Sequence, residues 1–202
     1  MGIVFVIAGA LAPATSWSSA TGDDATTARR TVRSIADRAL AILKRPDAAG
    51  RETAFLRLFR DEFATAAIGR FLLGAYRAAV TPAQFTRYQE VLEELVAKTT
   101  AARLSGYAGE GLEVLGARAD GRRWLVTSRV VPKTGEPVRL DWVLAPAGGA
   151  LKVVDLRVEN LSLAITERDE FASVLQANGG DIDRLIAFMR DKIKKLDDAG
   201  AQ

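Results

Sequence analysis

The spacing of apolar residues changes close to Gly106, and that change limits the possible folds. Before it, apolar residues recur every three or four positions, as on a helix, and after it they alternate, as on a strand. Strands are predicted over residues 112–118, 123–131, 138–145 and 151–159. The turn sequences Asp120-Gly121, Thr134-Gly135 and Gly148-Gly149 separate them. The pattern predicts a four-stranded antiparallel meander.

Helices are predicted before and after the meander, which makes the chain an α+β domain. Thr81, Pro82 and Gln84 have the spacing of a helix start in which the first and last side chains cap each other. After the strands, Thr166 is expected to cap a helix that ends at residues 178–180, and Asp181 to start the last helix. These helices must cover the apolar face of the sheet, because so large an apolar surface is unstable in water.

Alternation divides the predicted sheet into two faces. The apolar face holds Trp124, Val126, Ser128, Val130, Val138, Leu140, Trp142, Leu144, Val154, Leu156 and Val158. The other face is rich in charge and holds Arg129, Arg139, Asp141, Asp155 and Arg157, with Leu125, Val143 and Val153 among them. Asp141 and Asp155 are expected to pair across the strands with Arg139, Arg129 or Arg157.

The composition removes several kinds of chemistry. The chain has no His and no Cys, so it lacks the commonest general base, the commonest metal ligand, thiol nucleophiles and disulfides. We expect neither a metal site nor a cofactor. The net charge of +3 is small, and basic and acidic residues are interleaved, which argues against a nucleic-acid partner.

The segment 1–20 is uncharged and differs from the rest of the chain. Its apolar run is too short to span a bilayer, and Ser18-Ser19-Ala20 fits a cleavage site, although a basic start is missing. We therefore expect a secretory signal peptide over 1–20 and one exported domain over 21–202. No other stretch approaches the ~20 apolar residues of a transmembrane helix, so this domain is expected not to span a membrane.

Three blocks of the sequence resemble the MlaC-type periplasmic phospholipid-binding proteins, also called the toluene-tolerance family. They are FLLGAYRAAVTPAQFTRYQEVLEELVAKT, VTSRVVPKTGEPVRLDWVLA and VVDLRVENLSLAITERDEFASVLQANGGDIDRLI, and they stand in the family's order. Asn160 replaces the family's usual Gly at a turn, and Asn tolerates the left-handed backbone better than most residues. An aromatic residue that the family has near Ile165 is absent.

The resemblance implies a strongly twisted, cone-like sheet, similar in shape to nuclear transport factor 2, which helices wrap around an apolar cavity. It also implies a monomeric periplasmic carrier. Such a carrier takes a phospholipid between an outer-membrane lipoprotein complex and an inner-membrane ABC transporter complex. Individual ligand contacts are not implied, because the matching motifs are turns, caps and core positions.

The residues that we expect to line the cavity come from the sheet and from the helices. They are Trp124, Val126, Val130, Leu140, Trp142, Leu144, Val154, Leu156, Val158, Phe71, Tyr76, Tyr88, Leu92, Phe171 and Leu175. Leu161 and Leu163 are expected to re-enter the apolar layer after the turn at Glu159-Asn160. The same apolar residues also fit a core that packs directly on the helices and leaves no cavity.

Three other functions stay open from the sequence. A hopanoid carrier of the same family needs a wider and shorter pocket. An enzyme of this fold class can use a carboxylate as a general base, with Asp141, Asp155 and Tyr107 as candidates. Alternation places Asp141 and Asp155 on the face away from Leu140, which disfavours this role. A binding module without a small ligand predicts an exposed apolar patch instead of a cavity.

Overall fold

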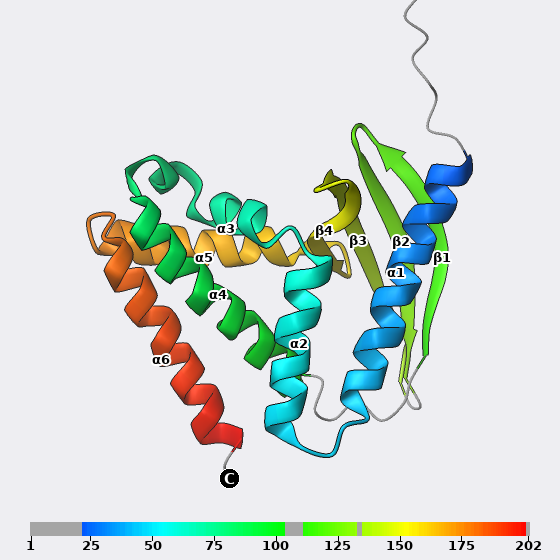
Figure 1. Cartoon of the computed structure of the whole chain (residues 1–202), viewed down its shortest axis with the longest axis horizontal. Helices are drawn as coiled ribbons and strands as arrows, with labels where there is room; N and C mark the ends of the chain where they lie inside the picture. The colour runs from blue at the N-terminus through cyan, green and yellow to red at the C-terminus, as the bar shows by residue number, and fades with distance from the viewer. Residues whose placement is uncertain (1–21, 104–110, 133–134, 201–202) are drawn as a thin grey trace, which may run out of the picture.

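The computed structural model describes residues 22–103, 111–132 and 135–200, so the expected signal peptide lies outside the described part. The helices are α1 (Gly22–Leu43), α2 (Ala48–Glu62), α3 (Thr65–Leu73), the 3₁₀ helix η1 (Gly74–Ala79), α4 (Pro82–Arg103), α5 (Leu163–Ala177) and α6 (Ile182–Gly200). The strands are β1 (Gly111–Asp120), β2 (Arg123–Val131), β3 (Val138–Ala147), β4 (Ala150–Val158) and β5 (Leu161–Ser162). Figure 1 shows the sheet at one end of the molecule, with α1 running along β1 and β2, and α4, α5 and α6 at the other end.

The predicted meander is confirmed, but it has five strands and not four. The order is β1-β2-β3-β4-β5, and every neighbouring pair is antiparallel. β5 pairs Leu161 with Val158 across a two-residue turn in which Glu159 and Asn160 have φ of 47° and 68°. The left-handed conformation expected at Asn160 is therefore confirmed, and turns of this kind suit a tight hairpin. Two residues are too few to show the alternation by which the sequence reveals a strand.

The helix after the sheet begins earlier than predicted. Its cap is Ser162 and not Thr166, because the Ser162 hydroxyl accepts a hydrogen bond from the Ile165 amide at 3.0 Å. The Ala164 amide donates to a carboxylate oxygen of Asp155 in β4, at 3.1 Å. Serine and threonine both favour this position, and the short β5 pairing decides between them by ending the strand at Ser162.

Two other local predictions are confirmed. Reciprocal hydrogen bonds join Thr81 and Gln84 at the start of α4, and Gly121 turns the chain between β1 and β2 with φ of 61°. Before α4 the helical chain is interrupted: α3 ends at Leu73 and η1 begins at Gly74, where φ is 53°. At Gly74 an added Cβ would lie 3.2 Å from the Arg168 side chain, so glycine serves both the backbone and the packing.

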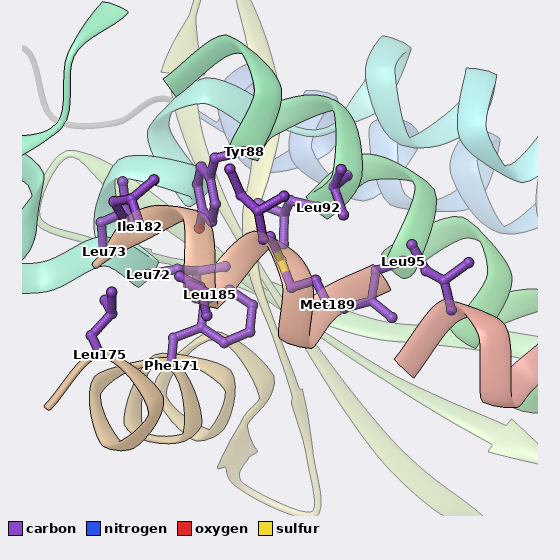
Figure 2. Close-up of a cluster of buried hydrophobic side chains, with 13 residues drawn as sticks. Leu72, Leu73, Tyr88, Leu92, Leu95, Phe171, Leu175, Ile182, Leu185 and Met189 are labelled. Atoms are coloured by element: carbon purple, nitrogen blue, oxygen red, sulfur yellow. The ribbon is translucent and has the colours of Figure 1, made fainter. Parts of the chain in front are cut away.

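The core is divided into separate clusters. The sheet cluster is made by Ala28, Val32 and Ile35 of α1 together with Val126, Trp142, Leu144 and Val153 of the sheet. The helix cluster is drawn in Figure 2 and is made by α3, α4, α5 and α6, with Tyr88 and Phe171 at its centre. A third cluster joins the end of α1 to α2 and α4. Among the described helices, none is long and apolar enough to cross a bilayer.

Candidate functional site

The apolar face of the sheet is where the sequence predicted it. Cross-strand pairing places Trp142 between Val126 and Leu156, and Leu140 between Ser128 and Val158. Trp124, Leu140 and Leu156 pack against the sheet cluster, and the charged residues of β3 point away from it. The alternation read from the sequence is therefore confirmed for β2 and β3.

The alternation fails in β4 at Val154. The register shifts between β3 and β4, so that Val143 pairs with Asp155 but Leu144 pairs with Val153. Val153 is fully buried in the sheet cluster, whereas Val154 is half-buried and outside it. The expected place of Val154 on the apolar face is thus wrong, because a β-bulge inserts one residue and moves Val153 to that face.

The apolar face is covered unevenly. At the end nearest the β1–β2 turn, Val126, Trp142 and Leu144 are buried in the sheet cluster with residues of α1, and Trp124 is half-buried at its margin. Towards the connection between β2 and β3, the apolar residues are only half-buried: Leu112, Val114, Val130, Leu140, Leu156 and Val158. Val138 lies beyond them and is exposed. The sheet therefore offers a graded apolar surface, buried in the sheet cluster at one end and half-buried, hence partly accessible, at the other.

One polar side chain lies within this face. Ser128 is fully buried in the middle of β2. Its hydroxyl donates to the Leu140 carbonyl oxygen at 2.8 Å and accepts from the indole nitrogen of Trp142 at 2.9 Å. Each polar atom of the pair is therefore satisfied, as buried polar groups generally are. Sequence reasoning placed Ser128 on the apolar face but gave it no partner.

The charged face carries ion pairs along the strands. Arg139 binds the buried carboxylate of Asp141, two residues away in β3, at 2.9 Å, and Arg157 lies 3.5 Å from Asp155 in β4. The expected partners Arg139 and Arg157 are confirmed, but each lies in the same strand as its aspartate, so the expected cross-strand geometry is wrong. A cross-strand pair does form between Glu113 and Arg129, at 2.7 Å. Within one strand, residues two apart share a face, and a long arginine can reach that far.

These contacts bear on the enzyme alternative. Asp141 faces away from the apolar cluster, and its carboxylate is bound by Arg139, so it does not reach the apolar face on which the enzyme alternative would need it. Tyr107 lies outside the described residues. Over the described ranges, no group of three or more acidic, His or Cys side chains could hold a metal ion.

The helical candidates do not join the sheet face. Tyr88, Leu92, Phe171 and Leu175 are buried in the helix cluster (Figure 2). Tyr76 is partly buried and packs against this cluster. The Tyr88 hydroxyl donates to the Gly69 carbonyl oxygen at 3.2 Å, and burial raises the pKa of that hydroxyl. The structure therefore places these residues in a packed core apart from the sheet cluster. Periodicity reveals which face of a helix is buried but not which cluster it joins.

Three further apolar residues that were expected to be covered are more exposed than predicted. Phe71 is 40% exposed, and the Arg168 guanidinium carbon lies 4.9 Å from the centre of its ring. Leu161 and Leu163, expected within the apolar layer, are 71% and 38% exposed. With Ile165 they form an apolar rim beside Val158, because Leu161 is the cross-strand partner of Val158.

A groove between α2 and α4 was not predicted. It has a volume of about 440 Å³, and charged and polar side chains dominate its lining: Glu52, Thr53, Leu56, Arg60, Glu90, Glu94, Ala97 and Lys98. Lys98 is bound to Glu52 and Asp197, and Arg60 to Glu93. Such walls do not suit acyl chains, which gain nothing from charged neighbours.

Comparison with known proteins decides the family. The family model described as "MlaC protein" matches residues 33–191. The chain belongs to the MlaC family. The expected family assignment is thus confirmed.

Two known proteins are similar to this MlaC-family chain, one in sequence and one in structure. The toluene tolerance protein ttg2D of Pseudomonas putida is 30% identical over 125 residues, which is 61% of this chain and 58% of the relative's own length. A phospholipid-binding protein of Ralstonia solanacearum, solved in complex with a phospholipid, has a similar structure with a TM-score of 0.74 and 26% identity. That similarity covers 84% of this chain and 98% of the Ralstonia chain.

Proposed function

We propose that this MlaC-family chain is a periplasmic phospholipid carrier, and that its acyl-chain site is the partly accessible end of the apolar sheet face. The site comprises Val130, Leu140, Leu156 and Val158, with Trp142 at its inner margin. The observation that carries the proposal is the half-burial of this apolar row in a fold shared with a protein that was solved with phospholipid bound.

The free energy of binding would come from shielding hydrocarbon from water. Each methylene removed from water contributes ~0.8 kcal/mol, and a wall of aliphatic and aromatic side chains provides that shielding without polar partners. Such a wall binds by chain length and shape, since it contains no exposed hydrogen-bonding group. Ser128 fits this requirement because both of its hydrogen bonds are internal.

The carrier would exchange its phospholipid with an outer-membrane lipoprotein complex and an inner-membrane ABC transporter complex. Family membership supports these partners and the periplasmic location. The chain would cross the aqueous gap as a monomer that holds the acyl chains, while the headgroup stays near the apolar rim of Leu161, Leu163 and Ile165. In this scheme, the protein catalyses no reaction.

Native mass spectrometry of protein purified without detergent tests the proposal. We expect a species heavier than the chain by the mass of a phospholipid, which organic solvent removes. The mass of the released ligand separates a phospholipid from a hopanoid. A bare chain at every ionisation energy, from cells in which the protein is exported, would contradict the proposed function.

A further inference from the structure

Ser128 is a polar residue in the middle of the apolar sheet face, and its contacts indicate a specific structural role. It is fully buried, its cross-strand neighbours on this face are Val114 and Leu140, and Trp142 packs beside it. The chain has no His, and no lysine stands on this face, so the hydroxyl has no base to activate it. Its two hydrogen bonds both stay within the sheet.

The hydrogen bond from Trp142 fixes the direction of the indole ring. An indole nitrogen is a donor only, and a buried donor without an acceptor is destabilising. Ser128 supplies the acceptor at 2.9 Å, and its own hydroxyl donates a hydrogen bond to the Leu140 carbonyl oxygen. The N–H edge of Trp142 is therefore turned to β2, which leaves the carbon edges of the ring for apolar neighbours.

We propose that Ser128 is a positioning residue for Trp142, which withholds the indole N–H from the lipid and so makes the site prefer unmodified hydrocarbon chains. This inference rests on the proposed function, because it assumes that acyl chains reach the margin of the site at Trp142. A chain with an acceptor group, such as a mid-chain ketone, gains no hydrogen bond there and must lose its hydration. Without the Ser128 hydroxyl, the freed N–H becomes a donor for that ketone.

A competition experiment on the full chain measures this preference. Delipidated protein is offered two phosphatidylglycerols that differ only in a ketone at the middle of one acyl chain, and native mass spectrometry gives the bound ratio. We expect Ser128→Ala to shift the ratio about tenfold towards the ketone lipid, the size of one hydrogen bond. Ser128→Thr keeps the hydroxyl and should keep the wild-type ratio.

Two further variants separate positioning from general packing. Thr127→Ala removes a hydroxyl one residue away, from the opposite face of β2, and should leave the ratio unchanged. In Ser128→Ala with Trp142→Phe, the donor is gone, and the preference for the ketone should disappear. The indole proton of Trp142 should also move upfield and exchange faster in Ser128→Ala, as observed by nitrogen-edited NMR.

The outcomes distinguish this inference from the proposed function. Wild-type protein that binds neither lipid overturns the proposed function, and this inference with it. Wild-type protein that binds lipid, with a ratio that Ser128→Ala leaves unchanged, overturns the positioning role alone. If Ser128→Ala does not fold, the bound ratio of the two lipids is compared between the wild type and Trp142→Phe. Equal ratios mean that the indole N–H is withheld from the lipid, which supports the inference. A stronger preference of the wild type for the ketone lipid overturns it.

Discussion

Asp141 and Trp142 are adjacent in β3 and serve opposite faces of the sheet. The Trp142 side chain is 5% exposed and packs in the sheet cluster, whereas Asp141 is 2% exposed and is held by Arg139. Burial alone does not distinguish the two, but their environments do. Because alternation is strict through this part of β3, neighbouring substitutions can report on the two faces separately.

The first prediction uses this alternation. Leu140→Asp places an unpaired carboxylate at the accessible end of the apolar face, and we expect it to abolish lipid retention in native mass spectrometry. Asp141→Asn removes a charge from the other face and should leave retention near the wild-type level. Circular dichroism must show that both variants are folded. Retention that survives Leu140→Asp and fails in Asp141→Asn would move the site to the charged face.

The second prediction concerns the two tryptophans of the sheet. Trp142 pairs with Leu156 next to the accessible end, while Trp124 lies one pair further, between Ala119 and Leu144. Phospholipid brominated along its chains should therefore quench Trp142 more strongly than Trp124, because bromine quenches only near contact. Trp124→Phe and Trp142→Phe, each combined with Trp17→Phe, isolate the two signals. Emission unchanged in a loaded complex would remove the lipid from this face.

The sequence was sufficient to predict most of the fold and one side of the site. Turn residues such as Asp120-Gly121 and the strict alternation of β2 and β3 are local signals, and the structure confirms them. Val154 and β5 were mispredicted because a bulge and a two-residue strand depend on pairing with a neighbouring strand. Such pairing leaves no period in the sequence.

The helical half of the candidate site could not be predicted in the same way. The apolar stripe of α4 correctly marks Tyr88 and Leu92 as buried, but three-dimensional packing decides that they face α3, α5 and α6. Ser128 and Trp142 are fourteen residues apart in the sequence and lie on different strands. Only the pairing register of β2 and β3 brings these two residues within hydrogen-bonding distance. A lone serine on an apolar face is nevertheless a usable signal, since buried hydroxyls require partners.

The third prediction separates the helix cluster from the lipid site. Leu92→Ala should destabilise the protein by about 2–5 kcal/mol through the cavity it leaves, yet the lipid bound per folded molecule should not change. Leu156→Ala, a matched change on the sheet face, should reduce lipid retention with a smaller loss of stability, because Leu156 is only half-buried. Denaturant unfolding and native mass spectrometry measure the two effects. If both variants lost lipid equally, residues of the helix cluster would have to be part of the lipid-binding site.

The fourth prediction concerns Glu167 in α5. Burial raises the pKa of its carboxyl, which Lys192, 3.7 Å away, offsets only in part. A raised pKa in the folded state means that folding favours the protonated form. The stabilisation is therefore complete below the ordinary pKa of a glutamate and is lost as the pH rises through the folded-state pKa. One carboxylate oxygen of Glu167 is buried without a hydrogen bond, which is most unfavourable when the carboxyl is charged.

Glu167→Gln should therefore raise the unfolding temperature at about pH 7 and change it little at about pH 4. Glu170→Gln is the matched control, because Glu170 is more exposed and binds Lys192 at 2.7 Å, so its replacement should give no gain. Thermal unfolding monitored by circular dichroism at the two pH values measures both effects. If Glu167→Gln lowered stability at neutral pH, the ion pair with Lys192 would outweigh the burial of the carboxylate.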